Sequence, residues 1–156
     1  MTELLAKNIM TANVVKVAPG TSIAELSKVL LKNKISGVPV VNEEGMLLGI
    51  VTEADIIKDN VKVQFPFYFD PLMVSGYAVD FEKYSEDIKD FLNSKVDAIM
   101  NRRVKTANPS TPVSEIADIM VSNKVNRVPV LDENKKIVGI ITRADIIKSM
   151  IETKSI

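Results

Sequence analysis

Apolar side chains recur at the spacing of an α-helix between residues 23 and 30. The apolar positions are Ile23, Leu26, Val29 and Leu30. Side chains three or four residues apart form one face of a helix. Ser22 followed by Glu25 matches the capping box that starts many helices, and Thr21 is an alternative cap. Because a β-rich segment over residues 14–17 comes first, the pattern predicts a strand followed by a helix.

The pattern then changes to two continuous apolar runs. Residues 38–41 and residues 46–51 are rich in valine, isoleucine and leucine, and a polar turn over residues 42–45 separates them, as in a pair of strands. Helical spacing returns from Ala54. The predicted order is strand, helix, strand, strand, helix. A three-stranded sheet with helices on one face leaves its other face apolar, so such a unit needs a second layer.

The same pattern occurs twice in the chain. Residues 9–58 align without a gap on residues 99–148, and twenty of the fifty positions are identical. Such self-similarity indicates two copies of one supersecondary unit. We predict a mixed α/β fold of the α+β class, in which the three-stranded sheets of the two copies pack together. The predicted division is residues 1–60 for the first repeat, 61–95 for a connecting segment and 96–156 for the second repeat.

The connecting segment differs from the repeats in composition. All eight aromatic residues of the chain lie within residues 61–95. Pro66 and Pro71 interrupt its first part, which we expect to be irregular, whereas residues 81–94 have helical spacing. Two interpretations stay open. The aromatic side chains form a satellite core that braces the repeats, or they form a self-association surface, where aromatic side chains are enriched.

Composition excludes several kinds of chemistry. The chain has no cysteine and no histidine, which excludes disulfides, thiol catalysis, Ser-His-Asp catalysis and the common zinc sites. No apolar run reaches the ~18 residues of a membrane span, and the start of the chain has no signal-peptide pattern. We therefore expect a cytoplasmic protein without membrane contact. Catalysis by Asp or Glu with Mg²⁺ is the remaining enzyme class, but no large carboxylate cluster indicates it, and we expect no enzyme.

Charge is balanced overall but not along the chain. Twenty Lys and Arg residues and twenty Asp and Glu residues give a formal net charge of zero, which argues against a nucleic-acid surface. Residues 96–150 carry nine basic and six acidic side chains and contain all four arginines. This modest local excess suits a small anion better than a polymer of phosphates.

A threonine and an aspartate recur three residues apart in both copies. Thr52 and Asp55 occur in GIVTEAD, and Thr142 and Asp145 occur in GIITRAD. This spacing is that of a helix cap, in which both side chains bond to the free N–H groups of a helix start. A carboxylate there also stays charged beside the helix dipole and accepts hydrogen bonds from the hydroxyl groups of a ligand. The cap and the ligand site are compatible, and both stay open.

Each copy resembles a cystathionine-β-synthase-type (CBS) domain, and the pair resembles a Bateman module. The resemblance rests on the blocks GVPVVNEEGMLLGIVTEAD and RVPVLDENKKIVGIITRAD, which stand in register with a predicted helix before each. It implies two βαββα repeats whose three-stranded sheets pack about a pseudo-twofold axis, with two clefts between the repeats. It also implies a homodimer. In similar nucleotide-binding members, a cleft takes an adenosyl compound such as AMP, ADP, ATP or S-adenosylmethionine.

The resemblance also implies which side chains bind ribose and adenine. The candidates for ribose are Thr52, Asp55, Thr142 and Asp145. The aspartates would accept hydrogen bonds from the ribose hydroxyl groups, with the threonines beside them. Ile50 and Ile140 would form an apolar wall for the base. Neither repeat contains an aromatic residue, so aliphatic side chains would sandwich the adenine, or an aromatic side chain of residues 61–95 would reach in.

Phosphate groups need cations, which the resemblance places just before the central Pro of the partner repeat. By this rule Asn126 and Arg127 would face the first cleft, whereas the second cleft would face only Ser36 and Gly37. Arg143, inside the second Thr-x-x-Asp, is a further cation candidate. We therefore predict that the first cleft binds phosphate better than the second.

Two functions follow from this reading. The first is a regulatory module that needs no cofactor, binds an adenosyl ligand between its repeats and passes the bound state to an unidentified regulated protein. The alternative is a ligand-free dimerisation or interaction scaffold, in which the threonines only cap helices and the aromatic segment makes the contacts.

Overall fold

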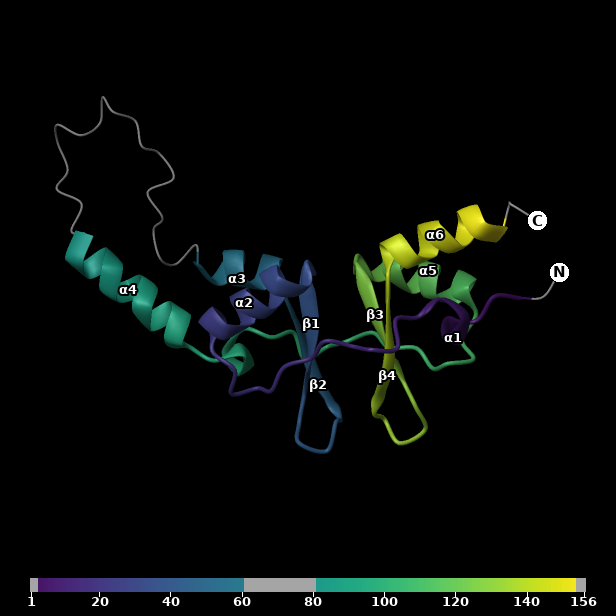
Figure 1. Ribbon diagram of the computed structural model, residues 1–156, viewed down its shortest axis with the longest axis horizontal. Helices are drawn as coiled ribbons and strands as arrows, with labels where there is room; N and C mark the ends of the chain where they lie inside the picture. The colour runs from purple at the N-terminus through teal and green to yellow at the C-terminus, as the bar shows by residue number, and fades with distance from the viewer. Residues whose placement is uncertain (1–2, 61–80, 154–156) are drawn as a thin grey trace, which may run out of the picture.

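The computed structural model describes residues 3–60 and 81–153, and the irregular part predicted for the connecting segment lies outside them. The first repeat contains α2 (Ile23–Asn33), β1 (Gly37–Val41), β2 (Leu47–Thr52) and α3 (Glu53–Asn60). The second repeat contains α5 (Val113–Asn123), β3 (Arg127–Leu131), β4 (Ile137–Thr142) and α6 (Arg143–Thr153). The predicted order of helix, two strands and helix is therefore confirmed in both repeats (Figure 1).

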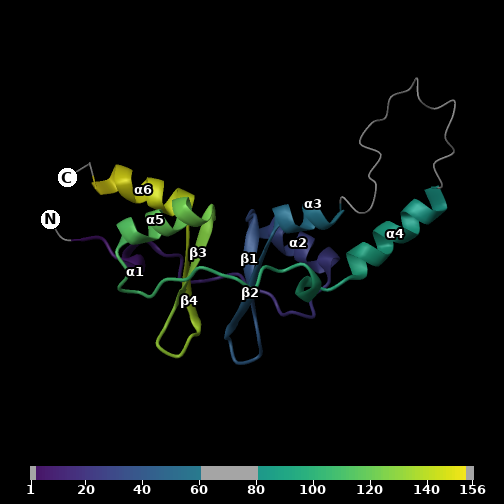
Figure 2. The same ribbon diagram turned by 180° about the vertical axis from the view of Figure 1, so that it is seen from behind.

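The strands form two antiparallel hairpins with the same register. Val38 lies opposite Val51 in β1 and β2, and Val128 lies opposite Ile141 in β3 and β4. All four side chains are fully buried, because these alternate positions face the helices of their own repeat. The hairpins lie side by side at the centre of the molecule, with their helices on opposite flanks (Figure 1, Figure 2).

The third strand predicted in each repeat is a single parallel bridge. Val17 bridges Val40, and the two hydrogen bonds that flank this bridge are each 3.0 Å long. The next rungs of the ladder would need N–H donors from Pro39 on one side and Pro19 on the other, and proline has no N–H. The second repeat has the equivalent bridge and the equivalent prolines, shifted by ninety residues. Each ladder therefore stops after one bridge.

The segment that precedes each repeat packs on the other repeat. In α1 (Ala6–Ile9), the Ala6 N–H donates to the Thr111 carbonyl at 2.8 Å. In the short 3₁₀ helix η1 (Val96–Ala98), the Val96 N–H donates to the loop before α2 at 2.9 Å. The side chains of Ala6 and Val96 are fully buried in the cores that they join. These crossings tie the two cores together, whereas the division of the chain at residues 60 and 96 stays a prediction.

Two glycines let the crossing segments approach the hairpins closely. A Cβ at Gly49 would lie 2.8 Å from the Met100 sulfur and 2.9 Å from the Asn101 carbonyl oxygen. At Gly139, a Cβ would overlap the side chain of Met10. Any larger residue would push the crossing backbone away from the strand.

Contacts between the repeats are reciprocal under the shift of ninety residues. Thr11 bridges Ile140, and Asn101 bridges Ile50. Each of these pairs becomes the other when ninety is added to one residue number and subtracted from the other. Two units related in this way are arranged as in a twofold interface, so the predicted packing about a pseudo-twofold axis is confirmed.

The helix predicted over residues 81–94 is α4 (Phe81–Asn93). Near its end, Phe91 and Leu92 pack against the core of the first repeat, and the helix contacts α2 at one end of the molecule (Figure 1). Phe91 therefore acts as a brace on the first repeat. For the aromatic residues outside the described part of the chain, both interpretations stay predictions.

Candidate functional site

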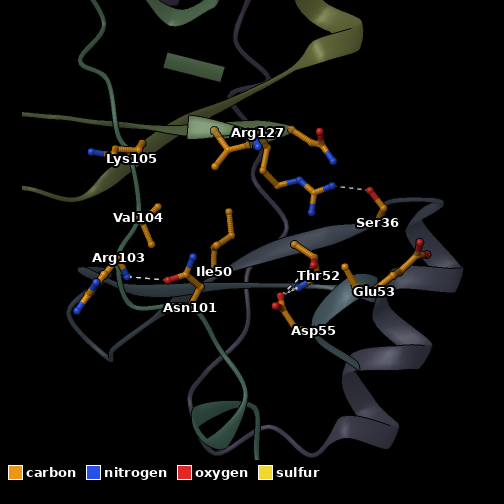
Figure 3. Close-up of a pocket in the computed structure, with 14 residues that line it drawn as sticks. Ser36, Ile50, Thr52, Glu53, Asp55, Asn101, Arg103, Val104, Lys105 and Arg127 are labelled. Atoms are coloured by element: carbon orange, nitrogen blue, oxygen red, sulfur yellow. Dashed lines mark hydrogen bonds between the residues drawn. The ribbon is translucent and has the colours of Figure 1, made fainter. Parts of the chain in front are cut away.

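The first candidate site lies where β2 passes directly into α3. Thr52 ends the strand, and Asp55 stands in the first turn of the helix. The Asp55 carboxylate accepts two hydrogen bonds through Oδ2, from the Thr52 N–H at 2.8 Å and from its hydroxyl group at 2.9 Å (Figure 3). Because both bonds end on one oxygen, Oδ1 keeps its lone pairs for another donor.

Thr142 and Asp145 repeat this arrangement at the start of α6. Asp145 Oδ2 accepts from the Thr142 N–H and from its hydroxyl group, each at 2.7 Å. The Asp145 N–H in turn donates to Thr142 Oγ1 at 3.4 Å. The bonds from threonine to aspartate are therefore present in both repeats, and the predicted cap is complete in the second, where a helix N–H also bonds to the threonine hydroxyl. The bonds to threonine end on one oxygen of each carboxylate. The other oxygen of each aspartate can still accept a hydrogen bond from a ligand.

The first cleft runs from Asp55 to the second repeat and has a volume of about 350 Å³. Its apolar wall is aliphatic and includes Ile50, Val104 and Val125, with no aromatic side chain among the described lining residues. The charged lining side chains are Glu53, Asp55, Arg103, Lys105, Lys124 and Arg127. Four basic and two acidic groups leave an excess of two positive charges, which favours an anionic ligand.

The second cleft is the pseudo-twofold counterpart of the first and has a volume of about 630 Å³. Its aliphatic wall includes Val14, Val15, Ile35 and Ile140. Its charged lining side chains are Lys34, Arg127, Arg143 and Asp145. All eleven site residues predicted from the sequence line one cleft or both. Their roles toward a ligand stay predictions.

Arg127, the first residue of β3, extends its guanidinium across Gly37 to Ser36. Its Nη2 donates to Ser36 Oγ, whereas Nη1 is buried and has no hydrogen-bond partner among the described residues (Figure 3). A Cβ on Gly37 would overlap the guanidinium, so only a glycine at position 37 leaves room for the Arg127 side chain. Burial lowers the pKa of Arg127 below its ordinary value, and the carboxylates of Glu53 and Asp55 oppose that shift. The group stays charged.

Ser36, Asn126 and Arg127 line both clefts. The expectation that the second cleft faces only Ser36 and Gly37 is therefore wrong. The reason is geometric, because the residues that begin β1 and β3 meet between the clefts instead of each facing one of them. Glu53 and Asp55, which line the first cleft, are the carboxylates that act on the Arg127 charge.

The crossing segments supply lining residues that the sequence did not reveal. The first cleft takes Asn101, Arg103, Val104 and Lys105, and the second takes Thr11, Asn13, Val14 and Val15. Lys124 and Lys34, at the C-terminal ends of α5 and α2, also line the first and the second cleft, respectively. The basic cluster of Arg102, Arg103 and Lys105 was a visible signal. That Arg103 and Lys105 line the first cleft could not be inferred from the sequence, because it depends on the segment before the second repeat packing on the first repeat.

Residues 3–60 and 81–153 contain neither a candidate metal site nor a candidate membrane-spanning helix. No group of three or more carboxylates in these ranges is placed to hold a metal ion. No helix within them is long and apolar enough to cross a membrane.

A family model for the CBS domain matches residues 6–61 and residues 96–152. These two matches coincide with the two hairpin-and-helix units that enclose the clefts. The chain belongs to the CBS domain family, and it carries two CBS domains that form a pair.

Solved and curated relatives agree with this assignment. Protein MJ1426 of Methanocaldococcus jannaschii is 35% identical over 155 residues, which are 95% of this chain and 92% of that protein. The structure of protein MJ1225 of the same organism is 30% identical with a TM-score of 0.76, and the match covers 95% of this chain and 48% of that one. The CBS domain pair of protein MJ0100, in complex with 5′-methylthioadenosine and S-adenosyl-L-methionine, is 26% identical with a TM-score of 0.73, covering 97% and 99%.

Proposed function

We propose that this CBS domain pair is a regulatory module that binds an adenosyl ligand between its repeats. The observation that carries the proposal is the first cleft, where the Asp55 carboxylate, with one oxygen outside its bonds to Thr52, and the half-buried guanidinium of Arg127 line one space. An acceptor for sugar hydroxyl groups and a donor for an oxyanion are the two polar groups that a nucleotide needs. The relative MJ0100, whose CBS pair was solved with two adenosyl compounds, supports this class of ligand.

Each part of such a ligand has a counterpart in the cleft. The ribose hydroxyl groups would donate to Oδ1 of Asp55, next to Thr52. The adenine would lie between aliphatic side chains, with Ile50 on one side and Val104 on the other. Phosphate groups, or another anionic group, would bind to Arg127. AMP, ADP, ATP and S-adenosylmethionine are the candidates, and the second cleft offers the same plan through Asp145, Thr142 and Ile140.

Ligand binding would be passed on through the packing of the repeats or of two modules. Four exposed apolar side chains on the helices are equivalent under the shift of ninety residues, namely Leu31 at 76%, Val121 at 76%, Ile57 at 65% and Ile147 at 59% exposure. Exposed apolar side chains on matching helices favour a symmetric self-association surface. We therefore include a homodimer in the proposal, together with a regulated protein that reads the bound state in the cytoplasm.

Thermal unfolding in the presence of candidate ligands tests the proposal. AMP, ADP, ATP and S-adenosylmethionine are titrated separately against the wild-type protein and Asp55→Ala. A ligand at one hundred times its Kd stabilises the folded state by about 2.7 kcal/mol, so its melting temperature should rise. The rise should be smaller in Asp55→Ala. No shift with any of the four at millimolar concentration would reject ligand binding and favour the alternative of a ligand-free scaffold.

That alternative rests on the same exposed apolar side chains. A scaffold would use Leu31 and Ile57 with their counterparts for assembly, and it would need nothing in the clefts. Charged substitutions such as Leu31→Glu would then abolish the function, whereas Asp55→Ala would only lower stability by about one helix cap, ~1 kcal/mol. Oligomeric state measured by native mass spectrometry, together with any retained ligand, separates the two functions.

A further inference from the structure

Arg127 and Gly37 occupy equivalent positions ninety residues apart, yet they lie against each other. A Cβ on Gly37 would overlap the Arg127 guanidinium. Met46 behaves in the same way, because it bridges Lys136, which is its own counterpart. Residues that contact their own counterparts lie beside the axis that relates two units. Arg127 therefore lies at the pseudo-twofold axis, on the wall between the two clefts.

Only one arginine fits at this place. A second arginine at position 37 would have to enter the space that Arg127 already fills, and two like charges in contact would repel each other. The clefts are symmetric in their threonines, aspartates and aliphatic walls, but they share one half-buried cation. Arg127 lines both of them, together with Ser36 and Asn126.

The shared guanidinium has a donor that is not used. Nη2 bonds to Ser36, and Nη1 is buried without a partner among the described residues. A buried donor without an acceptor is unfavourable, and the positive charge of the half-buried guanidinium attracts an oxyanion that enters either cleft. A guanidinium binds a phosphate through two parallel N–H bonds in its own plane. The two edges that allow this, Nη1 with Nη2 and Nε with Nη2, each use one N–H of Nη2. Ser36 already accepts from one N–H of Nη2, so one edge is left for one phosphate.

We propose that Arg127 is one cation shared by two clefts, so that the module holds a phosphate-bearing adenosyl ligand in one cleft at a time. This inference rests on the proposed function and adds a coupling between its two sites. The first phosphate takes the guanidinium, and the other cleft then has only exposed lysine and arginine side chains for a second phosphate. An adenosyl ligand without a phosphate fills that cleft unhindered.

Calorimetric titration with AMP and with adenosine tests the coupling in the full chain. The proteins are the wild type and Asp55→Ala, in which only the second cleft keeps its ribose acceptor. AMP should bind the second cleft of Asp55→Ala more tightly than it binds as the second ligand of the wild type. The expected difference is about 5- to 150-fold, the usual range of coupling between sites. Adenosine should bind both wild-type clefts independently.

Two outcomes would overturn this inference and leave adenosyl binding intact. One is that AMP fills both wild-type clefts with independent affinities, and the other is that AMP binds no better than adenosine. If neither AMP nor adenosine binds, both the inference and the proposed function fail.

Substitution of the arginine separates sharing from simple repulsion between two phosphates. In Arg127→Gly both repeats carry glycine at this position, so the coupling should disappear and AMP should bind more weakly than it binds the wild type. Coupling that persists in Arg127→Gly would show that repulsion is its source and would overturn the inference. The paired change Gly37→Arg with Arg127→Gly moves the cation to the first repeat. It should keep one AMP per chain, and two AMP molecules bound independently would also count against sharing.

Discussion

The guanidinium of Arg127 lies directly over the α-carbon of Gly37, its own counterpart in the other repeat. This relationship places one cation between two clefts that otherwise carry matching threonines, aspartates and aliphatic walls. The chain is thus symmetric in the groups proposed for ribose and adenine and asymmetric in the group proposed for phosphate.

The first prediction concerns the space at Gly37. In Gly37→Ala, the new methyl group would overlap the guanidinium and approach the Thr52 methyl group to 2.8 Å. Overpacking of this kind lowers stability by about 1–3 kcal/mol, and the displaced Arg127 should bind phosphate less well. Urea unfolding and AMP titration measure the two effects. Gly20→Ala is the matched control, because nothing lies within 4 Å of a Cβ there. Similar losses in both variants would contradict the assigned contact.

The second prediction concerns three lysines with left-handed backbone. Lys34 and Lys124 end α2 and α5 with φ of 53° and 54° and line one cleft each, whereas Lys135 has φ of 61° in a hairpin turn away from both clefts. This conformation costs about 1 kcal/mol in residues other than glycine. Each Lys→Gly variant should therefore raise the melting temperature, by up to about 2–4 °C.

Only the two cleft lysines should also affect binding. An exposed ion pair contributes ~0.2–1 kcal/mol, so Lys124→Gly should weaken AMP binding by up to about fivefold. Lys135→Gly should be equally stabilising and leave the affinity unchanged. A comparable loss of affinity in Lys135→Gly would show that the effect does not come from the cleft.

The local elements were predictable from the sequence, because helical and strand periodicity depend on near neighbours. The capping pair of Ser22 and Glu25 and the turn between β1 and β2 are examples. The crossing of α1 and η1 was not predictable. The apolar pattern is the same whether each of these segments packs on its own repeat or on the other one. The missed roles of Arg103 and Lys105 follow from that crossing. The shared position of Arg127 also escaped prediction, because it depends on an axis that no local pattern encodes.

The third prediction concerns the pH dependence of the start of α2. Glu25 Oε2 accepts from the Ser22 N–H and from its hydroxyl group, each at 3.1 Å. These hydrogen bonds, and chiefly the one from the Ser22 backbone, lower the pKa of Glu25 below its ordinary value of 4.5. The stabilisation is therefore complete above that value and is lost as the pH falls through the lower pKa of the folded state. Glu25→Gln should reduce stability near neutral pH and have progressively less effect below about pH 4.

The second repeat supplies a control for this pH effect. Glu115 is the counterpart of Glu25, but its helix starts after Pro112, which makes no side-chain cap bond. Thermal unfolding of Glu25→Gln and Glu115→Gln across this pH range compares the two. A stability difference between Glu25→Gln and wild type that stays constant with pH would contradict the capping role of the carboxylate.

The fourth prediction concerns the two aspartates and is the central one. Replacing both Asp55 and Asp145 by alanine removes the carboxylates from both clefts and also removes two helix caps. Each cap contributes about 0.5–2 kcal/mol, so a loss of stability alone is not informative. Ser22→Ala is the matched control, since it removes a cap from α2 without changing a residue that lines either cleft.

The most direct test is calorimetric titration of AMP and S-adenosylmethionine into the wild type, the double variant Asp55→Ala with Asp145→Ala, and Ser22→Ala. If the carboxylates hold ribose, at least one ligand should bind the wild type and Ser22→Ala with equal affinity and should not bind the double variant measurably. Binding to the double variant with the wild-type affinity would contradict the ribose role of the aspartates and leave them as helix caps only.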